Sequence, residues 1–241
     1  LGIEGLHLTG FEAAFGFAGL TALIGLTLVA MFVCEPGTVR DTDRRGRSRS
    51  LPSLRLDPVL ALGIVTFLMA VGIAMFATIG DVVNARLEQG ARMFGLQFAA
   101  FVLAHVVLQA PIGRLTDFYG RKPFLLIGAV LLIPTTAVQG FILDPWLMLG
   151  ARFAQGVAGA LVFTPALALA GDLAPGDGSG GTLSTLTMAF GLGIAVGPLL
   201  SGLLVSAGFH VPFVTGAALA SVGVVLIALR VPEPSRQRGA V

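Results

Sequence analysis

Charge is scarce in this sequence. Only 12% of the 241 residues are Asp, Glu, Lys or Arg, whereas a soluble domain carries roughly 25%. Hydrophobic residues make up 55% of the chain, and the mean hydropathy is +0.91. So little charge excludes an ordinary water-exposed surface. The chain is therefore predicted to lie in lipid, and the bilayer is its first expected partner.

Lysine and cysteine each occur only once, as Lys122 and Cys34. A single cysteine excludes a disulfide within the chain. The sequence has no Cys/His cluster at metal-ligand spacing and no supported Ser–His–Asp arrangement. The glycine-rich stretch GDGSGG at 176–181 follows an apolar run instead of a strand, so it does not predict a nucleotide-binding turn. We therefore expect no enzyme, no metal site and no bound cofactor.

Seven apolar runs each have about the 20 residues that a membrane-spanning helix needs. In lipid, every backbone N–H and C=O must be satisfied within its own segment, which favours a helix bundle. The predicted fold class is therefore all-α, a polytopic membrane helix bundle with seven transmembrane helices. The predicted spans are 11–34, 58–79, 92–111, 124–142, 146–171, 182–205 and 209–230.

The basic residues predict how the chain is oriented. If the helices alternate, one side receives six basic residues in loop 35–57, three in loop 113–123 and three at the C-terminal end, out of 15 in all. Basic residues mark the cytoplasmic side. We therefore expect a protein of the plasma (inner) membrane, with the N-terminus of this chain outside and the C-terminus in the cytoplasm. The net charge of +2 is then explained by orientation and anionic lipid headgroups, and nucleic acid is not an expected partner.

The first and last apolar runs resemble each other. Residues 10–36 align without a gap to residues 208–234, and ten of the 27 positions are identical. Transporters are commonly built from repeated halves. We therefore expect the first helix to end one six-helix repeat, whose other five helices lie outside this sequence. The expected parts are 1–34, the last helix of the N-terminal repeat; 35–57, a cytoplasmic inter-repeat loop; 58–234, the C-terminal six-helix repeat; and 235–241, a cytoplasmic tail.

Four motifs occur in the order and spacing of a known family. They are GRLTDFYGRKP (113–123), ARFAQGVAGA (151–160), GDLAP (171–175) and GIAVGPLLSG (193–202). The sequence resembles the major facilitator superfamily, in particular its drug/proton antiporters, over the C-terminal half and the helix before it. The first motif is similar to the family's G-x-L-x-D-x-x-G-R-K/R loop between the second and third helices of a half. Ser201 replaces the second trailing glycine of the last motif.

The resemblance implies a secondary active transporter that works by rocker-switch alternating access, with two six-helix bundles moving about a central site. We expect proton-coupled efflux of small amphipathic or drug-like molecules, with the proton as coupling ion. A proton-coupled sugar or metabolite symporter and, more remotely, a seven-helix receptor stay open as alternatives. The expected partners are a small-molecule substrate and the missing N-terminal repeat of the same protein.

The charged stretch at 113–123 is the candidate gate. Gly113 and Gly120 allow a tight turn between two antiparallel helices, and Asp117 lies within reach of Arg121 on a helical turn. The resemblance implies that Asp117, Arg121 and Asp172 form a charge cluster that holds one conformation and breaks in the other. The alternative is that the basic pair after Gly120 only anchors the loop in the cytoplasm. The predicted conformational gate comprises Gly113, Asp117, Gly120, Arg121, Lys122 and Asp172.

Ionisable residues inside the spans are costly in lipid and usually mark a pathway. His105 lies near the middle of span 92–111, and Arg152 lies about two turns inside span 146–171. A histidine carries a proton near neutral pH; a neutral histidine bonded to a neighbouring helix is the alternative. By the resemblance, Arg152 takes part in proton transfer or helix tethering. The predicted proton-coupling or substrate residues are His105, Gln109, Arg152 and Gln155.

Small residues and prolines predict close and bent helices. Gly193 and Gly197 allow two helices to approach each other, and Pro198 removes one backbone hydrogen bond and favours a kink. Pro134 and Pro165 interrupt two further spans. We expect these positions to serve helix packing more than substrate contact.

Overall fold

The structure is a computed structural model, and it describes residues 58–173 and 179–232 together with eight positions between 19 and 31. The chain divides into two units, Leu1–Leu51 and Pro52–Val241. In the first unit, the described residues are helical. Most of the predicted span 11–34, the predicted loop 35–57 and the predicted tail 235–241 lie outside the described residues.

Six helices of the second unit are long and apolar enough to cross a bilayer. They correspond to the six spans predicted after residue 57, so the all-α prediction is confirmed over this part of the chain. The long helices are α2 (Pro58–Thr78), α4 (Ala91–Tyr119), α5 (Arg121–Ala137), α6 (Pro145–Asp172), α7 (Ser179–Leu204) and α8 (Val211–Arg230).

Three short elements join the long helices. The helix α3 (Gly80–Arg86) follows α2, and the 3₁₀ turns η1 (Val138–Gly140) and η2 (Val205–Ala207) follow α5 and α7. The start of α6 is capped by Asp144, whose Oδ1 accepts hydrogen bonds from the backbone N–H groups of Trp146 at 2.9 Å and Leu147 at 2.8 Å. An Asp N-cap followed by proline is a strong helix start.

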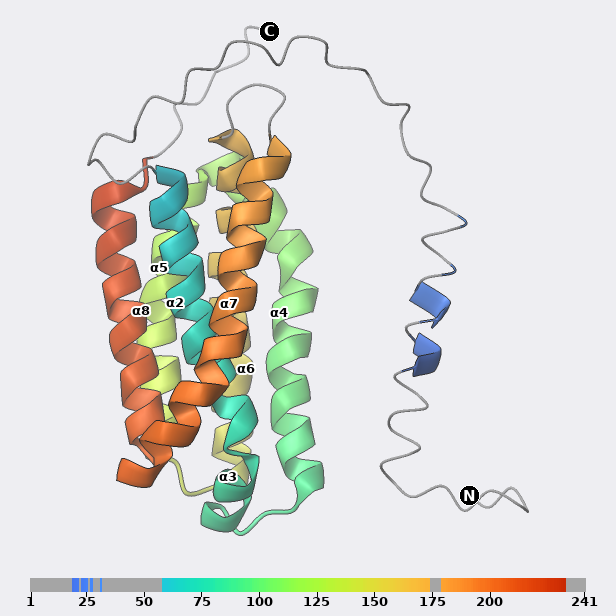
Figure 1. The fold of residues 1–241 in the computed structure, drawn as a ribbon, viewed down its shortest axis with the longest axis vertical. Coiled ribbons are helices and arrows are strands. Elements are labelled where there is room, and N and C mark those ends of the chain that lie inside the picture. Colours follow the sequence, from blue (N-terminus) through green and yellow to red (C-terminus); the bar gives the residue numbers. More distant parts are fainter. Residues whose placement is uncertain are drawn as a thin grey trace, which may run out of the picture. The chain divides into compact units, whose positions relative to one another are not determined.

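Consecutive long helices run in opposite directions (Figure 1). α2 packs against α7 and α8, α6 packs against α4 and α5, and α5 packs against α8. α4 and α8 lie at opposite edges of the bundle in the view of Figure 1. The most apolar stretch of α2 is 61% buried, whereas those of α4 and α7 are only 11% and 17% buried. α4 and α7 therefore present most of their apolar surface outside this bundle.

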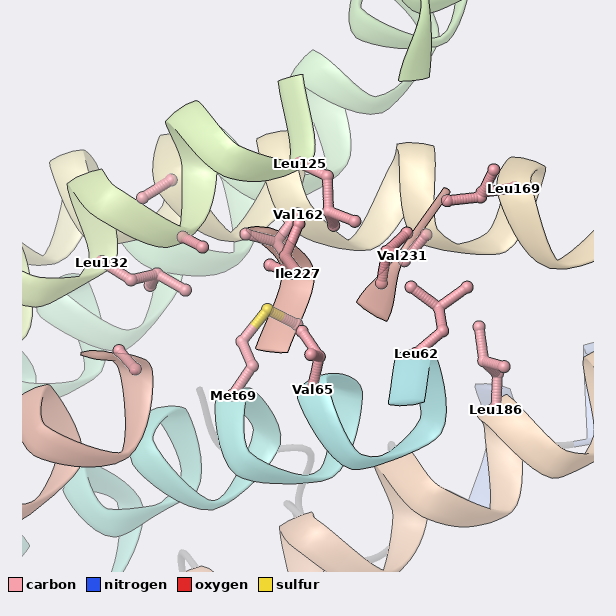
Figure 2. Close-up of a cluster of buried hydrophobic side chains, with 14 of the residues drawn as sticks. Leu62, Val65, Met69, Leu125, Leu132, Val162, Leu169, Leu186, Ile227 and Val231 are labelled. Carbon is pink, nitrogen blue, oxygen red and sulfur yellow. The ribbon is translucent and has the colours of Figure 1, made fainter. Parts of the chain in front are cut away.

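The main hydrophobic core lies between α2, α5, α6 and α8, with contributions from α4 and α7 (Figure 2). Its fully buried side chains include Leu62 on α2, Leu125 on α5 and Ile227 on α8. Because lipid is as apolar as these side chains, the contact is stabilised by close packing more than by removal of apolar surface from water.

Glycines bring α7 against the backbone of α2. A Cβ at Gly193 would lie 2.6 Å from the carbonyl oxygen of Phe67, and one at Gly197 would lie 2.6 Å from the carbonyl oxygen of Val71. No side chain has room at either position. Pro198 follows within α7, where it lacks the N–H that a helix interior uses.

The prediction of a loop over 113–123 is wrong in its extent. α4 continues to Tyr119 and α5 begins at Arg121, so Gly120 alone joins the two helices. Gly120 has φ 98° and ψ 157°, a conformation that is essentially restricted to glycine, whereas Gly113 lies inside α4. The physical reason is length: the 29 residues of α4 span about 43 Å at 1.5 Å per residue, more than the ~30 Å hydrocarbon core. The polar end of α4 thus stays helical beyond the lipid.

Candidate functional site

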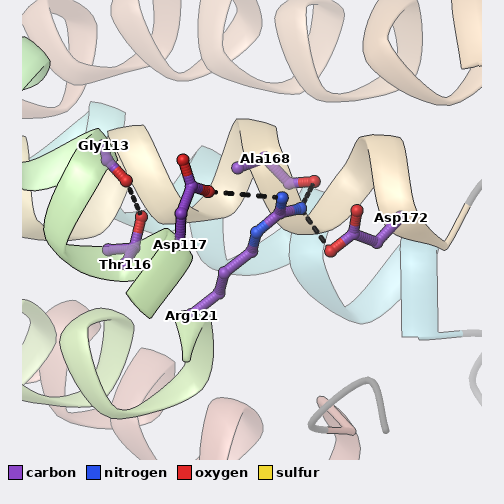
Figure 3. A network of polar contacts seen from close by, with 6 residues as sticks. All are labelled: Gly113, Thr116, Asp117, Arg121, Ala168 and Asp172. Atoms are coloured by element: carbon purple, nitrogen blue, oxygen red, sulfur yellow. Dashed lines mark hydrogen bonds and ion pairs between the residues drawn. The ribbon is translucent and has the colours of Figure 1, made fainter. Parts of the chain in front are cut away.

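The first candidate site is the charge cluster at the α4–α5 turn (Figure 3). Arg121 Nη2 lies 3.7 Å from Asp117 Oδ1 on α4, and Arg121 Nη1 forms an ion pair with Asp172 Oδ2 at the end of α6. The Arg121 side chain is 22% exposed, against 39% for Asp172 and 64% for Asp117. Solvent therefore screens the contact to Asp117 more than the contact to Asp172.

Both basic residues after Gly120 also donate to helix carbonyls. Arg121 Nη1 donates to the carbonyl oxygen of Ala168 on α6, and Lys122 Nζ donates to that of Ala228 on α8 at 3.3 Å. The C-terminal end of a helix carries the negative end of its dipole, which attracts a cation near its last turns. The α4–α5 turn is thereby tied to the same ends of α6 and α8, where a movement of either helix would break the contacts.

The second candidate site is centred on Arg152, which is 1% exposed. Its guanidinium carbon lies 4.0 Å from the ring centre of Phe76 on α2 and 4.6 Å from that of Phe101 on α4. A cation over aromatic faces is attracted by the ring quadrupole, more strongly where water is excluded. Arg152 is held between three helices by these contacts.

A network of polar side chains continues from Arg152 into α5. Arg152 Nη1 donates to Gln155 Oε1, which also accepts from Gln139 Nε2 at 3.0 Å. Gln155 Nε2 donates to Thr136 Oγ1 at 3.0 Å. Gln155, which the sequence predicted as a site residue, thus joins Arg152 to Thr136 on α5 and Gln139 on η1. The sequence did not predict a role for either of these two residues. An amide within a run of apolar residues was the available signal for Gln139.

A cavity of about 220 Å³ adjoins Arg152. His105 also contributes to its wall, and the His105 ring centre lies 6.0 Å from that of Phe101 and 5.7 Å from that of Phe163. Among the described residues, Nδ1 of His105 and both Nε and Nη2 of Arg152 are buried without a hydrogen-bond partner. The cavity is lined by Ile73, Ala74, Ala77, Phe98, Phe101, His105, Arg152, Phe190, Ile194 and Pro198.

Of the remaining residues predicted for helix packing or substrate contact, only Pro198 lines this cavity. Gln109 is partly exposed on α4 and does not line it. Gln97, about two turns before His105 on α4, is buried in a different contact. Its Nε2 donates to Gln89 Oε1 at 2.8 Å and to the Pro145 carbonyl at 3.0 Å. Pro198 does line the cavity, in addition to its place beside the α2–α7 contact.

A known protein family matches the part of the chain that begins near the start of α2. The profile of the Major Facilitator Superfamily matches residues 60–241. The class H tetracycline resistance protein of Pasteurella multocida is 27% identical over 186 residues, which cover 76% of this chain and 46% of that protein. The class C tetracycline resistance protein of Escherichia coli is 29% identical over 179 residues, covering 70% and 43%.

A probable actinorhodin transporter of Streptomyces coelicolor is 30% identical over 150 residues, covering 57% of this chain and 26% of that protein. The aligned part thus spans less than half the length of each of these three relatives.

Proposed function

Because the chain belongs to the Major Facilitator Superfamily, we propose that it is part of a secondary active transporter that exports small amphipathic or drug-like molecules in exchange for protons. The family match confirms the predicted family, which is one of transporters and not of enzymes. With six helices able to cross a bilayer, the chain is an integral membrane protein. Relatives that are named tetracycline resistance proteins support efflux as the direction of transport.

The observation that carries this proposal is the cavity beside Arg152. It is lined mostly by apolar and aromatic side chains, with one buried cation and one imidazole. Ligand sites for small molecules have this composition, with few polar groups that fix the orientation. A sugar would need many hydrogen-bonding groups in the wall, so the cavity favours an amphipathic compound over the alternative sugar symporter.

Residues 58–234 form one of two repeats in this proposal, and the substrate site is completed by the other. α4 and α7 leave their apolar stretches largely uncovered, and both contribute to the cavity through Phe98 and Phe190. This supports a site on the face where a second helix bundle would pack. The whole protein then works by rocker-switch alternating access.

The Arg121 cluster is the proposed conformational gate. One ion pair and two carbonyl contacts join the α4–α5 turn to the ends of α6 and α8, and a second ion pair, between Arg121 and Asp117, lies within the turn. A partly exposed cluster of this kind is strong enough to favour one state and weak enough to open. The proposed orientation places this end in the cytoplasm, because Arg114 and Arg230 also lie at this end of α4 and α8 and basic residues mark the cytoplasmic side.

His105 is the proposed proton-coupling residue. It lies in the cavity wall with an unpaired Nδ1, so that proton uptake and substrate contact would occur in the same space. Its Nδ1 is close to the backbone of α6, because a Cβ at Gly159 would lie 3.0 Å from it. Protonation of His105 would bring a second positive charge beside Arg152, which gives a physical reason for the substrate and the proton to influence each other.

The test is transport by the product of the complete gene in inside-out vesicles. We expect tetracycline, the compound named in two relatives, or another amphipathic probe to accumulate when the lumen is acidic and to leave when a protonophore is added. His105→Asn should keep substrate exchange without a gradient but lose proton-driven accumulation, and Arg92→Gln on the exposed start of α4 is the control. Equal accumulation with and without a proton gradient would contradict the proposed coupling. If none of a panel of amphipathic compounds is transported, the proposed efflux is contradicted.

A further inference from the structure

Arg152 has one occupied and one unoccupied edge. Nη1 is bonded to Gln155 Oε1, whereas Nε and Nη2 are buried without a partner among the described residues. Nε and Nη2 point along the same edge of the planar guanidinium and form the fork that a carboxylate binds with two parallel hydrogen bonds. A buried donor pair left without an acceptor is costly, so this edge is shaped for an oxyanion.

No acidic side chain of the described helices neutralises Arg152. The ion pairs among the described residues join Arg121 to Asp117 and to Asp172, at the far end of α6 from Arg152. The two aromatic rings over the guanidinium stabilise its charge but accept no hydrogen bond along its free edge. An anionic ligand would supply both the missing charge and the missing acceptors.

The size and walls of the cavity define what carries that oxyanion. A cavity of about 150 Å³ lined by apolar side chains holds benzene, and this one measures about 220 Å³. That is less than the roughly 300–1,000 Å³ of a whole drug site. Phe98, Phe101 and Phe190 line it from α4 and α7, and rings of this kind stack on aromatic ligands. The room fits one substituted ring.

We infer that the cavity is a subsite for an aromatic ring that bears a carboxylate, bound by the Nε–Nη2 edge of Arg152 with its ring among Phe98, Phe101 and Phe190. This inference rests on the proposed transport function, since it assigns the substrate class to the same cavity. The same carboxylate chemistry has a second source, an Asp or Glu side chain from a part of the protein outside the described residues. A carboxylate side chain alone would not fill the aromatic part of the cavity, which favours the free ligand.

The experiment compares two probes of nearly the same shape, salicylate and salicylamide, by calorimetry with the detergent-solubilised product of the complete gene. We expect salicylate to bind at least about tenfold more tightly, because hydrogen bonds to a charged acceptor are stronger than those to an amide. Arg152→Gln should abolish this preference, Arg152→Lys should keep part of it, and Arg92→Gln should leave it unchanged. Equal binding of the two probes by the unaltered protein would overturn the inference.

A second variant covers the case in which Arg152→Gln does not fold. Ala77→Phe narrows the cavity from its exposed edge on α2 and leaves residue 152 an arginine, so it should weaken both probes about equally. If an internal Asp or Glu occupies the fork, the unaltered protein shows no preference and Arg152→Gln lowers its thermal midpoint, which also overturns the inference. Proton-driven transport without salicylate preference refutes the subsite alone, and salicylate preference without proton-driven transport refutes the proposed function alone.

Discussion

The backbone of Gly156 on α6 lies directly against the carbonyl oxygen of Phe101 on α4: a Cβ at position 156 would be 2.3 Å from that oxygen. Gly156 comes one turn after Arg152, and Phe101 is one of the two rings under the guanidinium of Arg152. The close approach of the two helices therefore sets the position of the buried cation. Helix packing and the candidate substrate cavity depend on the same glycine.

Gly156→Ala should destabilise the protein and disturb the cavity. The added methyl meets backbone, which cannot move aside, and overpacking of this kind costs about 1–3 kcal/mol. Gly150→Ala on the same helix is the matched control, because a Cβ there meets nothing within 4 Å. The two variants are compared by their thermal midpoints in detergent, measured by size-exclusion chromatography of heated samples. Equal midpoints would show that α4 and α6 are farther apart than described.

The two glycines of the 113–123 motif should respond in opposite ways. Gly120 has φ 98°, and a side chain there costs about 1–3 kcal/mol in backbone strain. Gly113 lies within α4, where a Cβ would make an ordinary contact of 3.7 Å to Thr164 and alanine favours the helix by roughly 0.5–1 kcal/mol. We therefore expect Gly120→Ala to lower the thermal midpoint and Gly113→Ala to keep or raise it. A loss of stability in both variants would mean that the turn extends over the whole motif.

Sequence alone predicted the six spans after residue 57 because each is a long apolar run, and lipid requires such runs to be helices. It did not predict that α4 reaches Tyr119, because Arg114 and Asp117 look the same in a loop and in a helix that leaves the bilayer. The sequence did not predict α3 either, because its seven residues are too few to show a periodic pattern.

The candidate sites divide in the same way. Arg121 and Asp172 were recognisable as partners because each lies in a motif of the resembling family and the resemblance implied their contact, and the structure brings them together. The contact of Gln155 with Gln139 and Thr136 depends on how α5 and η1 pack on α6, which no spacing along the chain expresses. Gln97 shares a helix face with His105, yet it binds Gln89 and Pro145, because what a side chain meets depends on its depth along the helix as well as on its face.

The two acidic residues around Arg121 should contribute unequally to the gate. Asp172 is less exposed than Asp117, at 39% against 64%, so its ion pair is less screened by water. Even so, partly exposed pairs contribute only about 1 kcal/mol or less, which shifts a two-state equilibrium by up to roughly fivefold. We expect faster hydrogen–deuterium exchange at the α4–α5 turn in Asp172→Asn than in Asp117→Asn. Little change is expected in Arg114→Gln, an exposed neighbour, and the reverse order for the two acids would contradict the proposed gate.

The polar contact at the start of α4 gives a prediction for the opposite end of the bundle. Gln97 is 0% exposed and exchanges hydrogen bonds with Gln89, whose Nε2 also donates to Asn84 Oδ1 on α3 at 3.1 Å. Since Gln97 also binds the Pro145 carbonyl, its amide joins the connection after α3 to the start of α6. Gln97→Leu should therefore leave these groups unpaired, at a cost of about 1–3 kcal/mol.

Gln109→Leu is the matched control for this change, because Gln109 lies on the same helix, is partly exposed and does not take part in the contacts of Gln97. Limited proteolysis between α3 and α4 reports local opening, and the thermal midpoint reports global stability. We expect Gln97→Leu to accelerate cleavage there and to lower the midpoint, while Gln109→Leu changes neither.

The end of the bundle with Gln97 would then be closed by neutral amides and the end with Arg121 by ion pairs. Because salt screens ion pairs far more than amide contacts, raising the ionic strength should loosen the Arg121 end and leave the Gln97 end intact. Equal salt sensitivity of hydrogen exchange at the two ends would contradict this division.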